Sequence, residues 1–179
     1  MYVNTSLTIE TERLILRPFT PNDLHDFSLI CADPEVMRFI GLGKTLDKET
    51  VEQQMMSWIA SYQEHGFGLL AVTLKDTKRL IGFCGLLPQT VDGKSYLELG
   101  YRLERDSWNK GIATEAAKSI KNDASQRLKI PYLISIIHFE NFASKNVAQK
   151  IGMNLMKKTD FKGIPVDIFY LDLQDAKRP

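Results

Sequence analysis

Three apolar segments follow one another between residues 67 and 103, with only short links between them. Segments 67–75 and 80–87 are separated by a link of hairpin length. Residues 90–94, TVDGK, contain an Asp-Gly pair, which is a strong turn signal, and segment 95–103 follows. Its period of two predicts a strand with Leu97, Leu99, Tyr101 and Leu103 on one face and Tyr96, Glu98, Gly100 and Arg102 on the other. We therefore expect three consecutive antiparallel strands.

A strand and a block of helices are predicted before these strands. Residues 12–19 alternate apolar and polar side chains, which favours a strand. Thr20, Asp33 and Asp47 each stand at the start of a helical pattern, where their side chains are suited to cap the helix. Gly66 is typical of the end of the last of these helices.

Helices and strands alternate after residue 103. A helix is predicted to begin within 106–117, and a nearly continuous apolar run at 132–139 favours a strand covered on both faces. Residues 141–152 predict a second helix, and two final strands are expected at about 153–160 and 166–173. The buried stripe of the first of these helices is expected to consist of Ala113, Ala117, Ile120, Ala124 and Leu128. This order predicts an α+β protein with a single mixed sheet.

Size and composition predict one ordinary globular domain. The 179 residues suit a single domain over 1–179, with a core of about 11–173. A net charge of +1 argues against a broad basic face for nucleic acid, and no apolar run approaches the ~20 residues needed to cross a membrane. The N-terminus lacks the pattern of a signal peptide, so we expect a cytoplasmic protein.

Cysteine and phosphate-loop patterns indicate no metal and no nucleoside triphosphate. Cys31 and Cys84 lie far apart in apolar surroundings, which predicts two buried thiols in a reducing compartment. No paired-cysteine or paired-histidine spacing suggests a metal site. Residues 41–45, GLGKT, look like the end of a phosphate-binding loop, but Arg38 stands where that motif requires glycine.

The stretch DSWNKGIATEAA at 106–117 leads through a glycine into a helix that begins without bulky side chains. The first N–H groups of a helix have no intrahelical acceptor and carry partial positive charge. Gly111 allows close approach to the backbone, Ala113 adds little bulk, and Lys110 adds a positive charge. These features suit a phosphate or pyrophosphate. The motif taken alone is equally consistent with a tight packing corner between helix and strand.

A set of ordered motifs resembles the GNAT superfamily of acyl-CoA-dependent N-acyltransferases, and within it the branch of RimJ/RimL-type ribosomal-protein acetyltransferases. The segments are TERLILRPFTPNDL at 11–24, IGFCGL at 81–86, ELGYRLERDSWNKGIATEAAK at 98–118 and NFASKNVAQKIGM at 141–153. The resemblance implies a mostly antiparallel sheet of about seven strands, flanked by helices.

The resemblance also implies acetyl-CoA as co-substrate, with no metal. The pyrophosphate of coenzyme A is expected on the backbone N–H groups of Asn109, Lys110, Gly111, Ile112, Ala113 and Thr114. Trp108 stands where the superfamily usually has glutamine or arginine, a departure that is usual in this branch. The strand at Tyr101, Arg102 and Leu103 is expected to pair with the pantetheine arm and to splay from its neighbour. Asn141 is expected to bind pantetheine, and Asn146 lies near the cofactor or on a solvated helix face.

For the reaction, the resemblance implies direct attack of a neutral amine on the thioester. Glu98 matches a position where several family members place a carboxylate, and is the candidate base. The alternatives are a strand glutamate without a catalytic role, His138 as base, or proton loss through water. The tyrosine that many members use as acid is replaced by Ala148, so Ser144 is the candidate acid. Ser144 would otherwise only satisfy backbone groups in the first turn of its helix.

We therefore expect an N-acetyltransferase that acts on a primary amine, with a protein N-terminus as one candidate acceptor. Polyamines and other small amines stay open, as does the choice between monomer and homodimer. Acceptor walls are expected from 20–65 and about 157–168. The alternative is a non-catalytic acyl-CoA-binding sensor or regulatory protein of the same fold.

Overall fold

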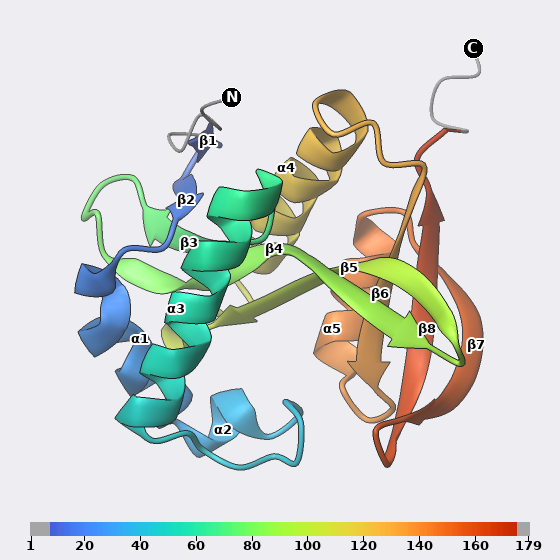
Figure 1. The fold of residues 1–179 in the computed structure, drawn as a ribbon, viewed down its shortest axis with the longest axis horizontal. Helices are drawn as coiled ribbons and strands as arrows, with labels where there is room; N and C mark the ends of the chain where they lie inside the picture. Colours follow the sequence, from blue (N-terminus) through green and yellow to red (C-terminus); the bar gives the residue numbers. More distant parts are fainter. Residues whose placement is uncertain (1–7, 175–179) are drawn as a thin grey trace.

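The computed structural model describes residues 8–174, which form one eight-stranded sheet flanked by helices (Figure 1). The strand order is β1-β2-β3-β4-β5-β6-β8-β7, and every neighbouring pair is antiparallel except β5 and β6. The strands are β1 (Ile9–Glu10), β2 (Leu14–Pro18), β3 (Leu69–Leu74), β4 (Leu80–Val91), β5 (Lys94–Leu103), β6 (Tyr132–His138), β7 (Asn154–Phe161) and β8 (Ile164–Asp172). The predicted α+β class with a single mixed sheet is confirmed.

The predicted domain of 1–179 extends beyond these residues at both ends. Residues 1–7 and 175–179 lie outside the described part, and the prediction about a signal peptide falls partly on the first of these ranges. Within residues 8–174, no helix combines the length and the apolar character needed to cross a membrane.

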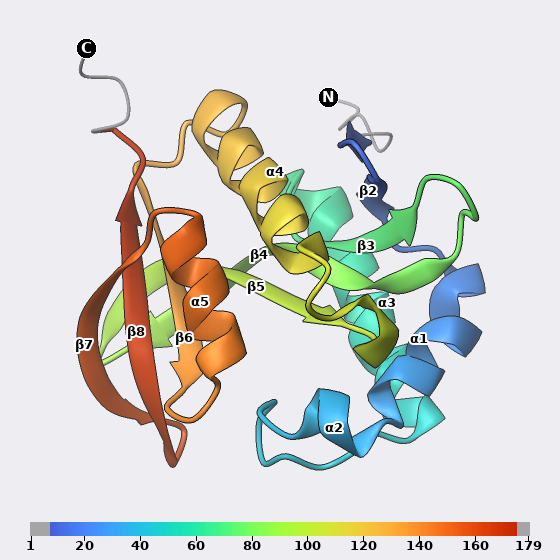
Figure 2. The ribbon, with the colours of Figure 1, turned by 180° about the vertical axis from the view of Figure 1, so that it is seen from behind.

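Helices cover both faces of the sheet. In the two opposite views, α1 and α3 lie on one face, and α4 and α5 lie on the other (Figures 1 and 2). The helices are α1 (Leu24–Cys31), α2 (Pro34–Met37), α3 (Lys48–His65), α4 (Ile112–Gln126) and α5 (Phe142–Lys150), with short 3-10 turns η1 (Pro21–Asp23) and η2 (Arg105–Ser107). Each face has its own apolar core: Leu70, Leu99 and Ile120 belong to the core beneath α4, and Phe27 and Phe83 to the core beneath α1.

The strands follow the predicted pattern with one addition. The turn between β4 and β5 contains Asp92 and Gly93, both with positive φ, as a tight hairpin turn with Asp-Gly requires. The eighth strand is β1, which pairs only Ile9 and Glu10 with β2. A strand of two residues is too short to show a period of its own, so the sequence pattern could not predict it.

The first helix begins later than predicted. Thr20 precedes the 3-10 turn η1, and α1 starts only at Leu24. The cause is Asp23, which is buried and accepts two hydrogen bonds of 2.8 Å from the guanidinium of Arg17 and one of 2.8 Å from the Thr20 backbone. These bonds hold the chain in a tight turn before the α-helix begins. The predicted caps Asp33 and Asp47 are confirmed, because each carboxylate accepts a backbone N–H in the first turn of its helix.

Three of the five residues predicted for the buried stripe of α4 are buried, namely Ala117, Ile120 and Ala124. The stripe also includes Ile112 and Ala116. Ala113 and Leu128 were both expected in this stripe, but they are only partly buried. Ile112 occupies the core, which turns Ala113 toward the cleft described below, and Leu128 lies beyond the end of the helix.

Strands β5 and β6 separate soon after they meet. β5 is paired with β4 along its whole length, from Lys94 to Leu103. Its pairing with β6 is limited to one register position, Glu98 opposite Ile134. The C-terminal half of β5 therefore has an unpaired edge that faces α5. This separation agrees with the splay expected for the strand at Tyr101 to Leu103.

Candidate active site

A cleft of about 470 Å³ opens where β5 leaves β6. Its walls are α2 with the loop after it, the end of β5 with the turn into α4, and the first turns of α5. The predicted site residues that line it are Tyr101, Arg102, Leu103, Trp108, Asn109, Gly111, Ile112, Ala113, Thr114, Asn141, Ser144 and Asn146. Lys110 and Glu98 were also predicted for the site, but neither is a lining residue of this cleft.

The turn into α4 leaves the first backbone N–H groups of this helix without a side-chain cap. Gly111 precedes the helix with φ of 77°, in the left-handed region that favours glycine, and Asn109 has φ of 58°. The residues from Gly111 to Thr114 all line the cleft. Because N–H groups at a helix start carry partial positive charge, this part of the cleft favours an anion.

Trp108 ties this turn to the end of β5. Its indole Nε1 donates a hydrogen bond of 2.9 Å to the carbonyl oxygen of Leu103, and the residue is 40% exposed. The aromatic ring therefore forms part of the cleft wall while its polar atom supports the turn.

Arg13 is a residue of this region that the sequence analysis did not identify. Its Nη1 donates to the carbonyl oxygen of Lys110 at 2.8 Å, and its Nη2 is the nearest atom to the position that a Cβ on Gly111 would occupy. Its Nε donates to Glu115 at 2.7 Å. Arg13 lies within the motif at 11–24, but only the folded chain places it beside the turn.

Glu115 in the first turn of α4 is paired with residues that lie just before β2. The carboxylate accepts hydrogen bonds from the Thr11 hydroxyl, the Arg13 backbone and the Arg13 guanidinium. Burial favours the neutral acid, but these bonds outweigh it and hold the pKa of Glu115 below its ordinary value. Its charge is thus paired with Arg13, which limits its repulsion of an anion at the helix start.

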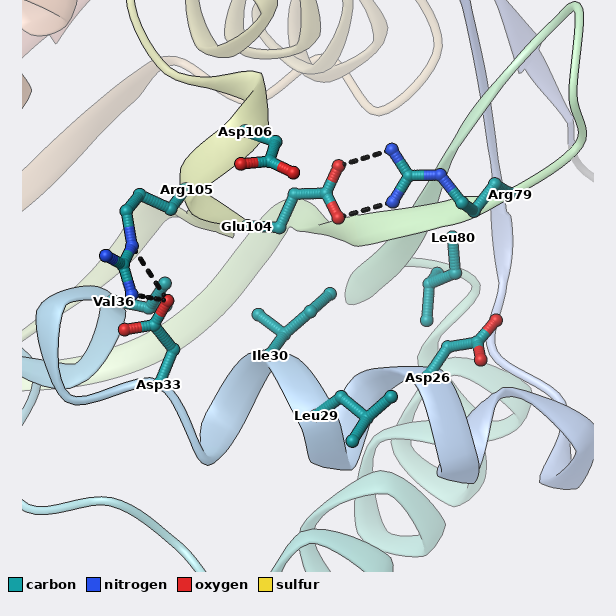
Figure 3. Close-up of a pocket in the computed structure, with 10 residues that line it drawn as sticks. All are labelled: Asp26, Leu29, Ile30, Asp33, Val36, Arg79, Leu80, Glu104, Arg105 and Asp106. Carbon is teal, nitrogen blue, oxygen red and sulfur yellow. Dashed lines mark hydrogen bonds and ion pairs between the residues drawn. The ribbon is translucent and has the colours of Figure 1, made fainter.

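A second hollow of about 420 Å³ lies on the outer side of η2, between this turn and α1 (Figure 3). Two ion pairs cross it. Arg79 binds Glu104 through two hydrogen bonds, and Arg105 binds Asp33 at the start of α2. These pairs connect the residues before the turn into α4 to the hairpin between β3 and β4 and to α2. The pair of Arg105 and Asp33 links two walls of the cleft.

Only alternate residues of β5 present their main chain to the open edge. Arg102 pairs directly with Phe83 of β4, and its carbonyl oxygen lies against Gly82. The N–H of Glu104 likewise donates to β4, at the carbonyl of Ile81. Tyr101 and Leu103 therefore direct their main-chain groups away from β4, toward the cleft. Of the three residues predicted to pair with pantetheine, Arg102 contributes its side chain to the cleft wall instead.

The start of α5 presents an amide and a hydroxyl to the cleft. The side-chain oxygen of Asn141 accepts the backbone N–H of Ser144 at 3.1 Å, so the amide nitrogen is directed away from this cap. Ala148, at the position where a tyrosine acid was expected from the resemblance, is 3% exposed and belongs to the core. The folded chain therefore supplies no acid at that position.

Tyr101 lies close to Ser144. Burial raises the pKa of the Tyr101 phenol to about 12, and a hydrogen-bonding contact with the Ser144 hydroxyl opposes this shift. The phenol is therefore protonated at neutral pH. The two hydroxyl groups, one from β5 and one from α5, face each other across the cleft.

Glu98 lies at the point where β5 and β6 separate. Loss of hydration raises the pKa of its carboxyl, and hydrogen bonds from Gln89 and from the Ile136 backbone offset this only in part. The Gln89 Nε2 donates to Oε2 at 2.9 Å. The other oxygen, Oε1, lies near Gly100, at 3.8 Å from the position that a Cβ on this glycine would occupy. A carboxylate with a raised pKa is suited to accept a proton.

His138, the alternative base, lies in an aromatic group. Its ring is 5.1 Å from that of Phe39 and 4.9 Å from that of Phe139, and its Nδ1 accepts the backbone N–H of Glu140. It is not a lining residue of the cleft. These contacts favour a structural role for His138.

The described residues contain no group of three or more histidine, cysteine, aspartate or glutamate side chains that would hold a metal ion. Cys31 and Cys84 are both buried and unbridged, as predicted. Burial raises the pKa of both thiols.

Two curated proteins of Bacillus subtilis (strain 168) resemble the chain over most of its length. "Uncharacterized protein YkkB" is 29% identical over 172 residues, which cover 93% of this chain and 96% of that protein. "Uncharacterized N-acetyltransferase YoaA" is 27% identical over 144 residues, which cover 80% and 81%.

Solved structures share the fold. An acetyltransferase from Agrobacterium tumefaciens str. C58 superimposes with a TM-score of 0.78 at 26% identity, covering 92% of this chain and 94% of its own. RimL, described as a ribosomal L7/L12 α-N-protein acetyltransferase in complex with coenzyme A, gives a TM-score of 0.78 at 13% identity, covering 93% and 98%.

The family described as "Acetyltransferase (GNAT) domain" matches residues 13–154, which span the cleft and all of its walls. This range contains the uncapped start of α4 at Gly111, the unpaired edge of β5 and the beginning of α5. The chain therefore belongs to the GNAT acetyltransferase family and is an acyltransferase.

Proposed function

We propose that the protein transfers the acetyl group of acetyl-CoA to a primary amine by direct attack in a ternary complex. The observation that carries the proposal is the continuity of two features in one cleft. The uncapped N–H groups at the start of α4 open into the same cleft as the unpaired edge of β5. A pyrophosphate and an extended pantetheine arm require these two features side by side.

The cofactor-binding residues follow from this placement. The backbone from Asn109 to Thr114, with the charge of Lys110, would hold the pyrophosphate. Tyr101 and Leu103 would pair with the pantetheine arm through the main-chain groups that they direct away from β4. Asn141 would donate from its amide nitrogen, because its oxygen already caps α5. Asn146 lines the cleft one turn beyond Asn141.

Glu98 is the base of the proposed reaction. The amine nitrogen forms a bond to the acetyl carbon, the carbon–sulfur bond breaks, and the amine proton passes to Glu98 through a water molecule. A carboxyl whose pKa is raised by burial holds such a proton better than an exposed one. A water is required because Glu98 lies at the separation of the strands and not in the wall of the cleft.

Ser144 is the acid that protonates the leaving thiolate. Its hydroxyl faces the cleft, and the neighbouring Tyr101 phenol keeps its proton at neutral pH. Tyr101 is therefore suited to resupply a proton to Ser144. This pair would replace the tyrosine that the resemblance leads one to expect at Ala148.

The acceptor class is a primary amine, with a protein N-terminus, a polyamine or another small amine as candidates. The name of RimL assigns it a ribosomal protein as acceptor, and that assignment is a property of RimL. We further propose that the protein acts as one domain over 1–179, as a monomer or a homodimer.

Thiol release from acetyl-CoA, measured across a panel of amines and N-terminal peptides, tests this function. We expect release with at least one amine, together with an acetylated product in mass spectrometry. Glu98→Gln and Ser144→Ala should lower the rate while acetyl-CoA binding persists in calorimetry. Binding of acetyl-CoA without release on any amine would contradict the proposal and favour the non-catalytic sensor.

A further inference from the structure

The guanidinium of Arg102 is buried with no carboxylate beside it. Arg102 is 8% exposed, and its Cζ lies 5.8 Å and 5.2 Å from the ring centroids of Phe27 and Phe83. Its Nη1 donates to the sulfur of Cys31 at 3.0 Å. Among residues 8–174, Nε has no hydrogen-bond partner, and no carboxylate forms an ion pair with this side chain.

Other arginines of the chain show what is missing at Arg102. Five of them pair with a carboxylate: Arg13, Arg17, Arg79, Arg105 and Arg127. Arg127 uses its Nε and Nη2, each of which donates to one oxygen of Asp123 at 2.7 Å. Neither Nε nor Nη2 of Arg102 has an acceptor among the described residues, and Nη2 is the one of the two that is not fully buried.

Among residues 8–174, the groups in contact with the Arg102 guanidinium carry no full negative charge. Burial raises the pKa of the Cys31 thiol even though Arg102 opposes this shift, so the sulfur is a neutral acceptor. The faces of Phe27 and Phe83 attract a cation, but more weakly than a carboxylate does. A buried charge without a counter-ion is costly, and a bound anion would remove this cost.

The side chain of Arg102 is what this residue contributes to the cleft, because its main chain is turned toward β4. It belongs to the same face of β5 as Gly100 and Glu98. Around Gly100, the Glu98 carboxyl is the one described group within 4 Å of the position that a Cβ would occupy. A carboxylate and a guanidinium thus stand on one face of the strand, with a gap between them.

We propose that the acceptor is an amino acid, meaning an amine that carries a carboxylate on the same molecule, and that this carboxylate binds the free Nη2 of Arg102. The inference rests on the proposed N-acetyltransferase function and narrows its acceptor. The amine then lies toward Glu98 across the gap at Gly100. Residues 98 and 102 are ~13 Å apart along the strand, a span that two side chains and a small zwitterion fill. Amines without an anionic group leave the guanidinium without a counter-ion.

Matched pairs of acceptors test this assignment. Free amino acids are compared with their carboxamides in the thiol-release assay, for the wild type, Arg102→Met, Arg102→Lys and Lys118→Gln. Lys118 is an exposed residue of α4 and controls for the loss of one positive charge. The wild type and Lys118→Gln should prefer the free acid. In Arg102→Met, the KM for the free acid should rise by about 10- to 100-fold while the KM for the carboxamide stays nearly constant.

Arg102→Lys should recover part of this preference at most, because lysine keeps the charge but not the planar guanidinium that places an N–H donor at the Nη2 position. A carboxamide preferred by the wild type, or an equal loss for both acceptors in Arg102→Met, would overturn the inference and leave the N-acetyltransferase function standing.

Product binding provides a second readout that does not need turnover. N-acetyl amino acids should raise the melting temperature of the wild type more than their carboxamides do, and this difference should vanish in Arg102→Met. If no amine is acetylated but this difference is present, the proposed function fails and the Arg102 anion site stands. If the difference is absent, the anion site is wrong.

Discussion

Replacing Gly111 with alanine should weaken both acetyl-CoA binding and folding, whereas the same change at Gly163 should affect folding alone. Gly111 precedes α4 with φ of 77°, and Gly163 lies in the hairpin between β7 and β8 with φ of 80°. A residue with a Cβ in this left-handed region costs about 1–2 kcal/mol. In a chain of this size, that cost lowers the melting temperature by about 2–8 °C.

The two positions differ in what surrounds them. A Cβ at Gly163 would meet nothing within 4 Å, and a Cβ at Gly111 would meet only the Nη2 of Arg13, at 3.5 Å. That distance is an ordinary contact, so no steric clash adds to the backbone strain at Gly111. The added methyl group would, however, stand beside the free N–H groups of α4. Loss of one charge-assisted hydrogen bond to a phosphate costs about 1.5–3 kcal/mol, which is about a 10- to 100-fold rise in Kd.

Calorimetric titration with acetyl-CoA, together with thermal denaturation, separates the two effects. We expect both variants to lose a similar amount of stability and only Gly111→Ala to lose affinity. An unchanged Kd in Gly111→Ala, with the expected loss of melting temperature present, would refute the placement of the pyrophosphate at this turn.

Four further substitutions probe the proton path and the fold. Glu98→Gln should lower kcat and remove the acid limb of the pH–rate profile. In the wild type, kcat should fall as the pH drops through the raised pKa of Glu98, because the protonated carboxyl accepts no proton; an acid limb that persists in the variant would contradict this role. Ser144→Ala and Tyr101→Phe should each reduce kcat by about 10- to 100-fold at constant KM, and less than additively when combined; additive losses would argue against a shared path. Asp23→Asn should cost about 2–4 kcal/mol in chemical denaturation, because the guanidinium of Arg17 loses its buried partner. Burial favours the neutral acid, but the hydrogen bonds from Arg17 and Thr20 lower the pKa of Asp23 below 3.8. The contribution of Asp23 to the free energy of unfolding is therefore complete above pH 3.8 and is lost as the pH falls through the lowered pKa. A variant with the same acid sensitivity as the wild type would count against this.

Much of the fold could be predicted because its signals are local. The hairpin between β4 and β5 needs only an Asp-Gly turn between two apolar strands, and both residues of the turn have the positive φ that the pattern demands. The uncapped start of α4 at Gly111 was recognisable for the same reason, since a glycine before small residues leaves backbone groups open whatever packs around them. The burial of Ile112 in place of Ala113, by contrast, depends on how α4 packs against the sheet, and that packing is not local.

The candidate site shows the same division. Its backbone elements were predictable, but the roles of its side chains were not. The orientation of a side chain and the residues that it contacts depend on how distant segments of the chain pack together. Arg13 is about a hundred positions from Lys110 in the sequence, and only the packing of β2 beside α4 brings them together. Glu98 could be assigned to a face, yet its distance from the cleft follows from the single register position at which β5 meets β6.

The sequence by itself therefore determined the order of strands and helices and the glycine turn that suits a pyrophosphate, because period, turn chemistry and helix starts act over a few residues. Only the tertiary structure decided which charges are paired. Arg102 reads in the sequence as one polar residue on an alternating strand, like many others. Its lack of a counter-ion becomes visible only when α1 and β4 close around it, since burial and ion pairing are properties of the packed chain.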